Sequence, residues 1–295
     1  MNWKKDLSLL KIALKHNQKK IMIFFVVIIS ILIPCIYFIN KNKTFIVDNL
    51  MGFNKTNKSI LLNNGLSEDD LSEFIKQYSL AHKGVYSVSM IELSGRLRQA
   101  SYNKTRVFTS ASTYKLFVAY STLKRVEDGS WKWTDNILPD IDLSTCFDAM
   151  ISKSDNECAE ALIEKIGYRI ATSEAYSIGC KNTTFISLDG LAKTTASDLA
   201  LFLVKLHKGQ ILKEQSSRDR LMKAMKNNIH REGIPAGVNS LLIDKPGQIN
   251  SFINDAAIIY SPTGIYVLVI MSDGSSWKDM ADFAKNIDKI RTVGF

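Results

Sequence analysis

A serine and a lysine one helical turn apart are the residues of this chain best suited to covalent chemistry. Ser112 and Lys115 lie three positions apart, and a helix places side chains at that spacing on one face. A serine hydroxyl is a weak nucleophile unless a neighbouring base takes its proton. A lysine can be that base only where burial or a nearby positive charge lowers its pKa. The pair indicates nucleophilic catalysis, although such a pair also occurs by chance on surface helices.

Two further polar motifs follow in the chain. Ser-Asp-Asn at 154–156 brings a second hydroxyl, and Lys-Pro-Gly at 245–247 brings a second lysine. Each tripeptide by itself is commonly a turn, and the first is also a common helix cap. Gathered around Ser112 and Lys115, they would supply a proton relay and a binding site for an anion.

The three motifs, in this order and in their local context, resemble those of class A β-lactamases and penicillin-binding proteins. The resemblance covers roughly residues 66–295. It implies an α+β fold of the β-lactamase/transpeptidase type, in which helices flank an antiparallel sheet and an all-helical subdomain is inserted. It also implies a serine hydrolase that opens β-lactam amides through an acyl-enzyme and needs no metal or organic cofactor.

Three of the matched residues carry the expected chemistry. The resemblance makes Ser112 the nucleophile, Lys115 a proton acceptor for it, and Ser154 the shuttle that takes a proton to the leaving nitrogen. Arg231 and Asp244 also match family positions, and we expect them to form a structural ion pair behind the site.

Four residues are expected to bind the substrate. Asn156 would contact the amide side chain of the substrate, and Lys245 would steer its carboxylate. Gly247 completes the third motif, and Gln248 follows it. The backbone N–H groups of Ser112 and Gln248 would form the oxyanion hole.

The chain departs from the family pattern at two places. Pro246 stands where the family has Thr or Ser, so a hydroxyl that helps to hold the substrate carboxylate is missing. Class A enzymes also have a loop glutamate that activates the deacylating water. The matching segment here, 183–195, has Asp189 as its only acid. Glu160 stands where those enzymes have an asparagine and is an alternative base, but a solvated helix glutamate is the simpler interpretation.

The missing glutamate leaves three activities open. Overall similarity of the domain favours a β-lactamase. Residues 183–203 resemble D-alanyl-D-alanine carboxypeptidases, which would act on the peptidoglycan stem peptide. The third is a β-lactam or cell-wall sensor that is acylated but turns over poorly.

Positive charge is concentrated at the N-terminus. Of the formal +9, six lysines and one acid before residue 21 contribute +5, so the high charge is no evidence for nucleic-acid binding, and we expect no nucleic-acid partner. Residues 21–39 are an apolar run long enough to span a bilayer. We therefore predict a cytoplasmic basic tail (1–20), a transmembrane signal anchor (21–39), a stalk (40–65) and a hydrolase domain (66–295) outside the cell membrane. A cleaved signal peptide or a lipoprotein at Cys35 fits less well, because the residues expected at a processing site are missing.

Three cysteines follow the apolar run, so at least one thiol has no partner within the chain. Cys146 and Cys158 flank the Ser-Asp-Asn motif and are the first pair to test. Three buried thiols, Cys180 included, are an equally good interpretation. The four histidines are scattered, and no histidine–cysteine cluster has metal-ligand spacing, so we expect no metal site.

The expected elements place strands at both ends of the domain and helices between them. A helix with Ser67 as its N-cap comes first. The others are a strand at 84–93 with a hairpin partner at 96–102, a helix at 113–127, mainly helical structure over 142–206, strands at 244–260 and 264–272, and a terminal helix at 277–293. Strands from distant parts of the chain must pair in one sheet, which predicts an α+β fold.

Overall fold

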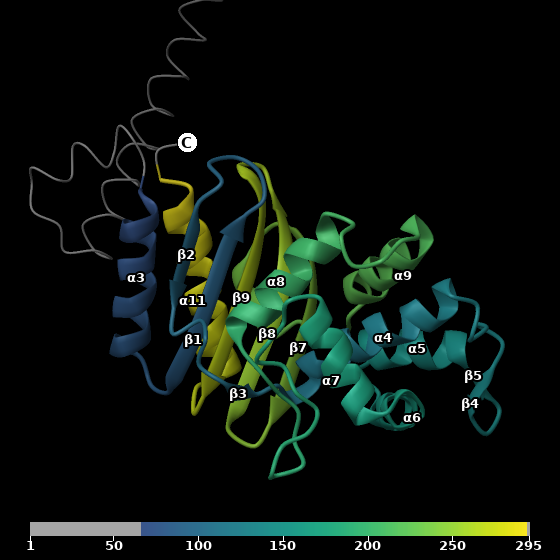
Figure 1. Cartoon of the computed structure of the whole chain (residues 1–295). Coiled ribbons are helices and arrows are strands. Elements are labelled where there is room, and N and C mark those ends of the chain that lie inside the picture. The colour runs from purple at the N-terminus through teal and green to yellow at the C-terminus, as the bar shows by residue number, and fades with distance from the viewer. Residues whose placement is uncertain (1–65, 294–295) are drawn as a thin grey trace, which may run out of the picture. The chain divides into compact units, whose positions relative to one another are not determined.

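A five-stranded antiparallel sheet forms the centre of the protein, whose computed structural model describes residues 66–293. The strand order is β2-β1-β9-β8-β7. The bounds are β1 (Val85–Glu92), β2 (Gln99–Tyr102), β7 (Leu241–Ile249), β8 (Phe252–Ser261) and β9 (Gly264–Asp273). β1 pairs with β9, so the two ends of the domain meet in one sheet as predicted (Figure 1). The predicted α+β fold is confirmed.

Helices cover both faces of this sheet. α3 (Glu68–Ala81) and α11 (Trp277–Arg291) pack on one face, and α8 (Ala196–His207) packs on the other (Figure 1). The middle of β9 is therefore buried on both of its faces, which fits its continuous apolar sequence. α3 begins where the sequence predicts, because the Ser67 side chain accepts from the Asp70 N–H.

The predicted single strand over 244–260 is wrong. The segment forms two strands, β7 and β8, joined by a tight turn at Asn250 and Ser251. Asn250 has a φ of +49°, in the left-handed region that asparagine tolerates better than most residues. Ile249 and Phe252, Ile253 flank the polar pair Asn250-Ser251, so a turn of only two residues lies between two strand-like segments. The hairpin makes β7, which carries the Lys-Pro-Gly motif, an edge strand.

The segment between β3 (Phe108–Thr109) and β7 supplies an inserted group of helices. Its members are α4 (Lys115–Glu127), α5 (Leu143–Ser152), α6 (Asn156–Ile166), α7 (Tyr168–Ser177) and α9 (Gln215–Lys226) (Figure 1). α8 leaves this group to cover the sheet. The sequence analysis missed α9, the short α10 (Ile234–Gly237), and the two-residue and three-residue strands β3, β4 (Asn136–Leu138), β5 (Ile141–Asp142) and β6 (Lys193–Thr194).

A disulfide joins Cys146 of α5 to Cys158 of α6. Both are buried, and Cys180 is a buried free thiol. Ser154 lies in the loop between α5 and α6. The disulfide links these two helices and so restrains both ends of that loop.

The predictions for residues 1–20, 21–39 and 40–65 lie outside the described residues. Of the helices in the described part of the chain, none has both the length and the apolar composition needed to cross a bilayer.

Candidate active site

The expected nucleophile lies in a tight turn at the start of a buried helix. Ser112 is half-buried in the 3₁₀ turn η1 (Ala111–Tyr114), and α4 begins directly after it at Lys115. The predicted helix at 113–127 is confirmed, with a first turn that is wound more tightly. Ala111 has a φ of +46°, which costs an L residue about 1–2 kcal/mol. The strained turn presents Ser112 at the surface while the helix behind it stays in the core.

The edge strand β7 passes Ser112 at backbone contact distance. A Cβ at Gly247 would lie 2.3 Å from the Ser112 nitrogen and 2.9 Å from its Cα. No residue other than glycine fits there unless the backbone moves. The close approach brings Gln248 to Ser112, and the N–H groups of these two residues are those expected to stabilise an oxyanion.

Two buried lysines meet at the Ser154 hydroxyl. Lys115 Nζ lies 3.4 Å from Ser154 Oγ, and Lys245 Nζ lies 2.9 Å from the same atom. Lys115 also donates to the Ser154 carbonyl at 2.6 Å and to Asn156 Oδ1 at 2.7 Å. Neither lysine has exposed surface. One hydroxyl therefore links the three motifs, as a proton relay requires.

Burial makes both lysines weaker bases than free lysine. It lowers the pKa of Lys115 to about 8, against the opposing effect of the Asp155 and Glu160 carboxylates. The pKa of Lys245 is lowered to about 7, first by burial and then by the charge of Lys115. Repulsion between the two lysines adds to the effect of burial, and a neutral Lys115 is accessible near neutral pH.

A cleft with two lobes opens beside Ser112. The lobes have volumes of about 410 Å³ and about 320 Å³, and Ser112, Asn156 and Gln248 line both. Ser154 and Gly247 line the smaller lobe. Five of the seven predicted site residues therefore face the space where a substrate would bind. The two lysines lie beneath it, and the structure brings all seven together.

Other residues of the cleft were not found from the sequence. Tyr114, Tyr168 and Phe185 line the larger lobe, and His230 and Trp277 line the smaller one. Tyr114 lies between Ser112 and Lys115, and this position is the only feature of the sequence that could have shown that it lines the cleft. The others come from elements whose packing against Ser112 cannot be read from local spacing.

Comparison with known proteins fits this arrangement. A family model described as "Beta-lactamase enzyme family" matches residues 68–294 of the chain. The chain belongs to this family. The protein is thus a serine hydrolase of the class A β-lactamase and penicillin-binding protein kind.

Solved structures of this kind share the fold. A structure of PBP-A has 21% sequence identity and a TM-score of 0.69, with 75% of this chain and 95% of that chain covered. An ancestral class A β-lactamase has 22% identity and a TM-score of 0.67, covering 74% and 99%. A β-lactamase from Sphaerobacter thermophilus has 18% identity and a TM-score of 0.64, covering 73% and 94%. No curated protein matches the chain.

The Ser-Asp-Asn loop of this family member is a helix cap. Ser154 has a φ of +58°, and the Asp155 side chain caps α6 by accepting from the Cys158 N–H at 2.8 Å. Asn156 is the first residue of α6. The cap therefore holds Ser154 and Asn156, which are expected to act in catalysis and substrate binding, beside Lys115.

The two departures from the family pattern have different structural settings. Pro246 lies in the edge strand β7, where a missing N–H is tolerated, and its carbonyl accepts from Lys245 at 3.2 Å. Asp189 lines neither lobe of the cleft. It pairs with Lys193 and accepts from the Ser187 hydroxyl, and these contacts hold the pKa of Asp189 well below its usual range.

Arg231 and Asp244 form the predicted ion pair behind the site. Asp244 is fully buried on β7, next to Lys245, and Arg231 is the partner of one of its carboxylate oxygens. Because removal of one partner would leave a buried charge uncompensated, the pair supports the strand that carries Lys245.

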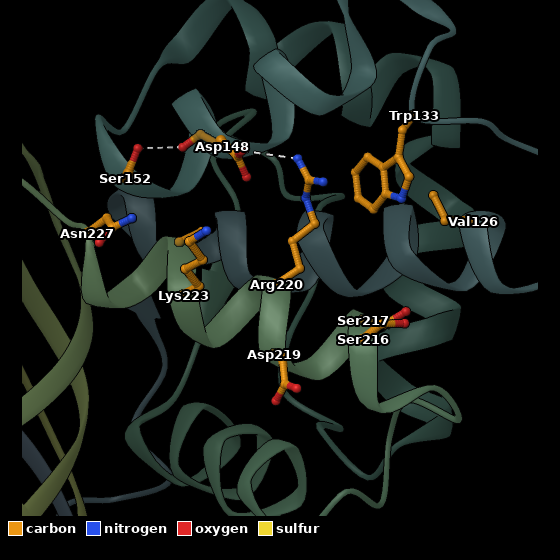
Figure 2. A pocket seen from close by; sticks show the side chains of 11 residues that line it. Val126, Trp133, Asp148, Ser152, Ser216, Ser217, Asp219, Arg220, Lys223 and Asn227 are labelled. Atoms are coloured by element: carbon orange, nitrogen blue, oxygen red, sulfur yellow. Dashed lines mark hydrogen bonds and ion pairs between the residues drawn. The ribbon is translucent and has the colours of Figure 1, made fainter.

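A separate cavity of about 540 Å³ lies between α5 and α9 (Figure 2). The guanidinium of Arg220 stacks on Trp133, 3.8 Å from the ring centroid, and pairs with Asp148. None of the residues of the three motifs lines this cavity. In the described part of the chain, no group of three His, Cys, Asp or Glu side chains is placed to hold a metal ion.

Proposed function

We propose that this protein is a membrane-anchored, extracytoplasmic serine hydrolase that opens β-lactam amides through an acyl-enzyme at Ser112. The observation that carries the proposal is the relay of Lys115, Ser154 and Lys245 beneath a cleft that exposes Ser112. A structure of a PBP-A mutant is an acyl-enzyme complex with penicillin G, which supports a β-lactam as the substrate class.

The geometry supports an ordered transfer of one proton. Neutral Lys115 accepts the Ser112 hydroxyl proton as Oγ forms a bond to the β-lactam carbonyl carbon. The N–H groups of Ser112 and Gln248 stabilise the oxyanion. The C–N bond then breaks, and the nitrogen takes the proton of the Ser154 hydroxyl. The proton held by Lys115 replaces it across the 3.4 Å contact, so Lys115 is neutral again.

Lys245 has a second task in this scheme. Its ammonium lies 2.9 Å from Ser154 Oγ and stabilises negative charge that develops there. It also attracts the carboxylate that β-lactams carry. Because Pro246 has no hydroxyl, that carboxylate depends more heavily on Lys245 than it does where the family has Thr or Ser.

Two alternatives use the same acylation chemistry. A D-alanyl-D-alanine carboxypeptidase would acylate Ser112 with a stem peptide, and a sensor would be acylated by a β-lactam and released slowly. The larger lobe is bounded by Phe185, Gly190, Leu191 and Ala192 of the 183–195 segment, none of which carries a carboxylate. Because this part of the lobe offers no carboxylate, we expect deacylation to be slower than in an efficient class A enzyme.

Acylation is tested on the full chain purified in detergent. Intact mass after penicillin treatment should rise by one adduct, and Ser112→Ala should abolish the rise. Ser216→Ala, which changes an exposed serine of the separate cavity, is the matched control and should keep the adduct. An adduct that survives in Ser112→Ala would overturn the assignment.

The proposed anchor rests on the lysines before residue 21 and the apolar run at 21–39. Protease added to intact cells should degrade the catalytic domain and leave the N-terminal tail intact. Complete protection of the domain would contradict this topology.

A further inference from the structure

The larger lobe of the cleft contains one carboxylate. Among the residues that line it, Glu160 is the only acid, and Ser112 lines the same lobe. A carboxylate in the space around an acyl-enzyme ester can remove a proton from attacking water, which is the step for which the 183–195 segment provides no group.

The helix position of Glu160 directs it to the cleft. It lies four residues after Asn156 on α6, so the two side chains share one face of the helix. Asn156 accepts from Lys115 at 2.7 Å, which fixes that face toward the catalytic lysine. The charge of Glu160 accordingly acts on Lys115.

Two phenols hold the Glu160 side chain. Tyr114 donates to Oε1 at 3.2 Å, and Tyr168 donates to Oε2 at 3.5 Å. A carboxylate can accept about four hydrogen bonds, so each oxygen keeps a free lone pair. Both contacts are long and leave the carboxylate oriented without neutralising it.

Two other acids near the cleft are less suited to this role. Asp189 belongs to the 183–195 segment but lines neither lobe, and its carboxylate is occupied by Lys193 and Ser187. Glu232 lines the smaller lobe and not the larger one. A carboxylate base is needed on the side of the acyl group, where Glu160 is.

We propose that Glu160 is the general base that activates water for hydrolysis of the Ser112 acyl-enzyme. The inference rests on the proposed function. Glu160 accepts one proton of a water as the water oxygen bonds to the ester carbon. The oxyanion then collapses, the carbon–Oγ bond breaks, and Ser112 Oγ takes the proton back from Glu160. The product is a carboxylic acid, and both residues return to their starting states.

Glu160 cannot match a base positioned by a dedicated loop. The hydrogen bonds from Tyr114 at 3.2 Å and Tyr168 at 3.5 Å are long, so they orient the carboxylate only loosely. We therefore expect the acyl-enzyme to accumulate, with a burst of product followed by a slow steady state. That slow phase is the one that depends on Glu160.

The test is stopped-flow hydrolysis of a chromogenic cephalosporin by the full chain in detergent, together with intact-mass decay of the penicillin adduct. Glu160→Gln keeps the size of the side chain and one of its two acceptor oxygens but removes the base. It should lower the steady-state rate and lengthen the adduct lifetime by about 10²–10⁴-fold, while the burst rate stays within about twofold. Glu164→Gln, one turn further along α6 and outside the cleft, should change neither rate.

The outcomes separate this proposal from the proposed function. An unchanged steady state in Glu160→Gln, or a loss confined to Asp189→Asn, would overturn the role of Glu160 while acylation stands. Equal loss of burst and steady state in Glu160→Gln would also overturn it, because the residue would then shape the cleft rather than act on water. Absence of a burst and of an adduct in the unmodified chain would instead refute the proposed function.

Discussion

A methyl group at position 247 should disable acylation, because β7 and the nucleophile turn are in backbone contact there. The Cβ of Gly247→Ala would lie 2.3 Å from the Ser112 nitrogen, 2.9 Å from the Ser112 Cα and 3.0 Å from the Thr113 nitrogen. All three are backbone atoms, so no side-chain rotation can relieve the overlap. Either η1 or β7 must move.

The size of the movement follows from these distances. Ordinary contact begins at 3.4 Å, so the two backbones must separate by roughly 1 Å, and a misplacement of this size in a reacting group costs about 10²-fold in rate. The same shift moves the Ser112 N–H away from Gln248, and loss of one oxyanion donor costs about 10²–10³-fold. We therefore expect the acylation rate constant to fall by at least about 10²-fold.

The assay is the rate of labelling by a fluorescent penicillin at several concentrations, with thermal unfolding measured on the same sample. Gly129→Ala is the control, because a Cβ there meets nothing within 4 Å. Its φ of +76° should cost about 1 kcal/mol of stability and leave acylation unchanged. Acylation of Gly247→Ala at the rate of the unmodified chain would refute the steric argument.

Two further predictions follow from the same site. Acylation requires neutral Lys115 (pKa lowered to about 8) and charged Lys245 (pKa lowered to about 7), so its rate should rise with pH up to about 7 and fall above about 8. The product of the two populations should peak between pH 7 and 8, and a labelling rate that is flat from pH 6 to 9.5 would contradict this. The disulfide between Cys146 and Cys158, 12 residues apart, should contribute about 2–3 kcal/mol to the free energy of unfolding. Denaturation with and without reductant measures that contribution, and equal midpoints would show that it is negligible.

The chemistry of the site was readable from local spacing. Ser112 and Lys115 share a helix face whatever the rest of the chain does, and Asp155 caps the helix that Asn156 begins. Strand and helix patterns also led to the α+β fold. The seven site residues were identified from the resemblance to a family. Spacing within the sequence cannot show that the three distant motifs meet at one site.

Tertiary structure decided the rest. The turn at Asn250 divides the predicted single strand into two strands and makes Lys245 a residue of an edge strand beside Ser112. The contact of Gly247 with the Ser112 backbone joins residues more than a hundred positions apart. The orientations of Glu160 toward the cleft and of Asp189 away from it depend on how α6 and the 183–195 segment pack.

The physical reason is the range of the interactions. Helix periodicity and capping involve neighbours within four positions, so the sequence displays them directly. Whether Glu160 or Asp189 faces the acyl group depends on contacts with Tyr114, Tyr168 and Lys193, which come from three other elements. Such contacts form only when the core has closed around them, because each alone is too weak to order the chain.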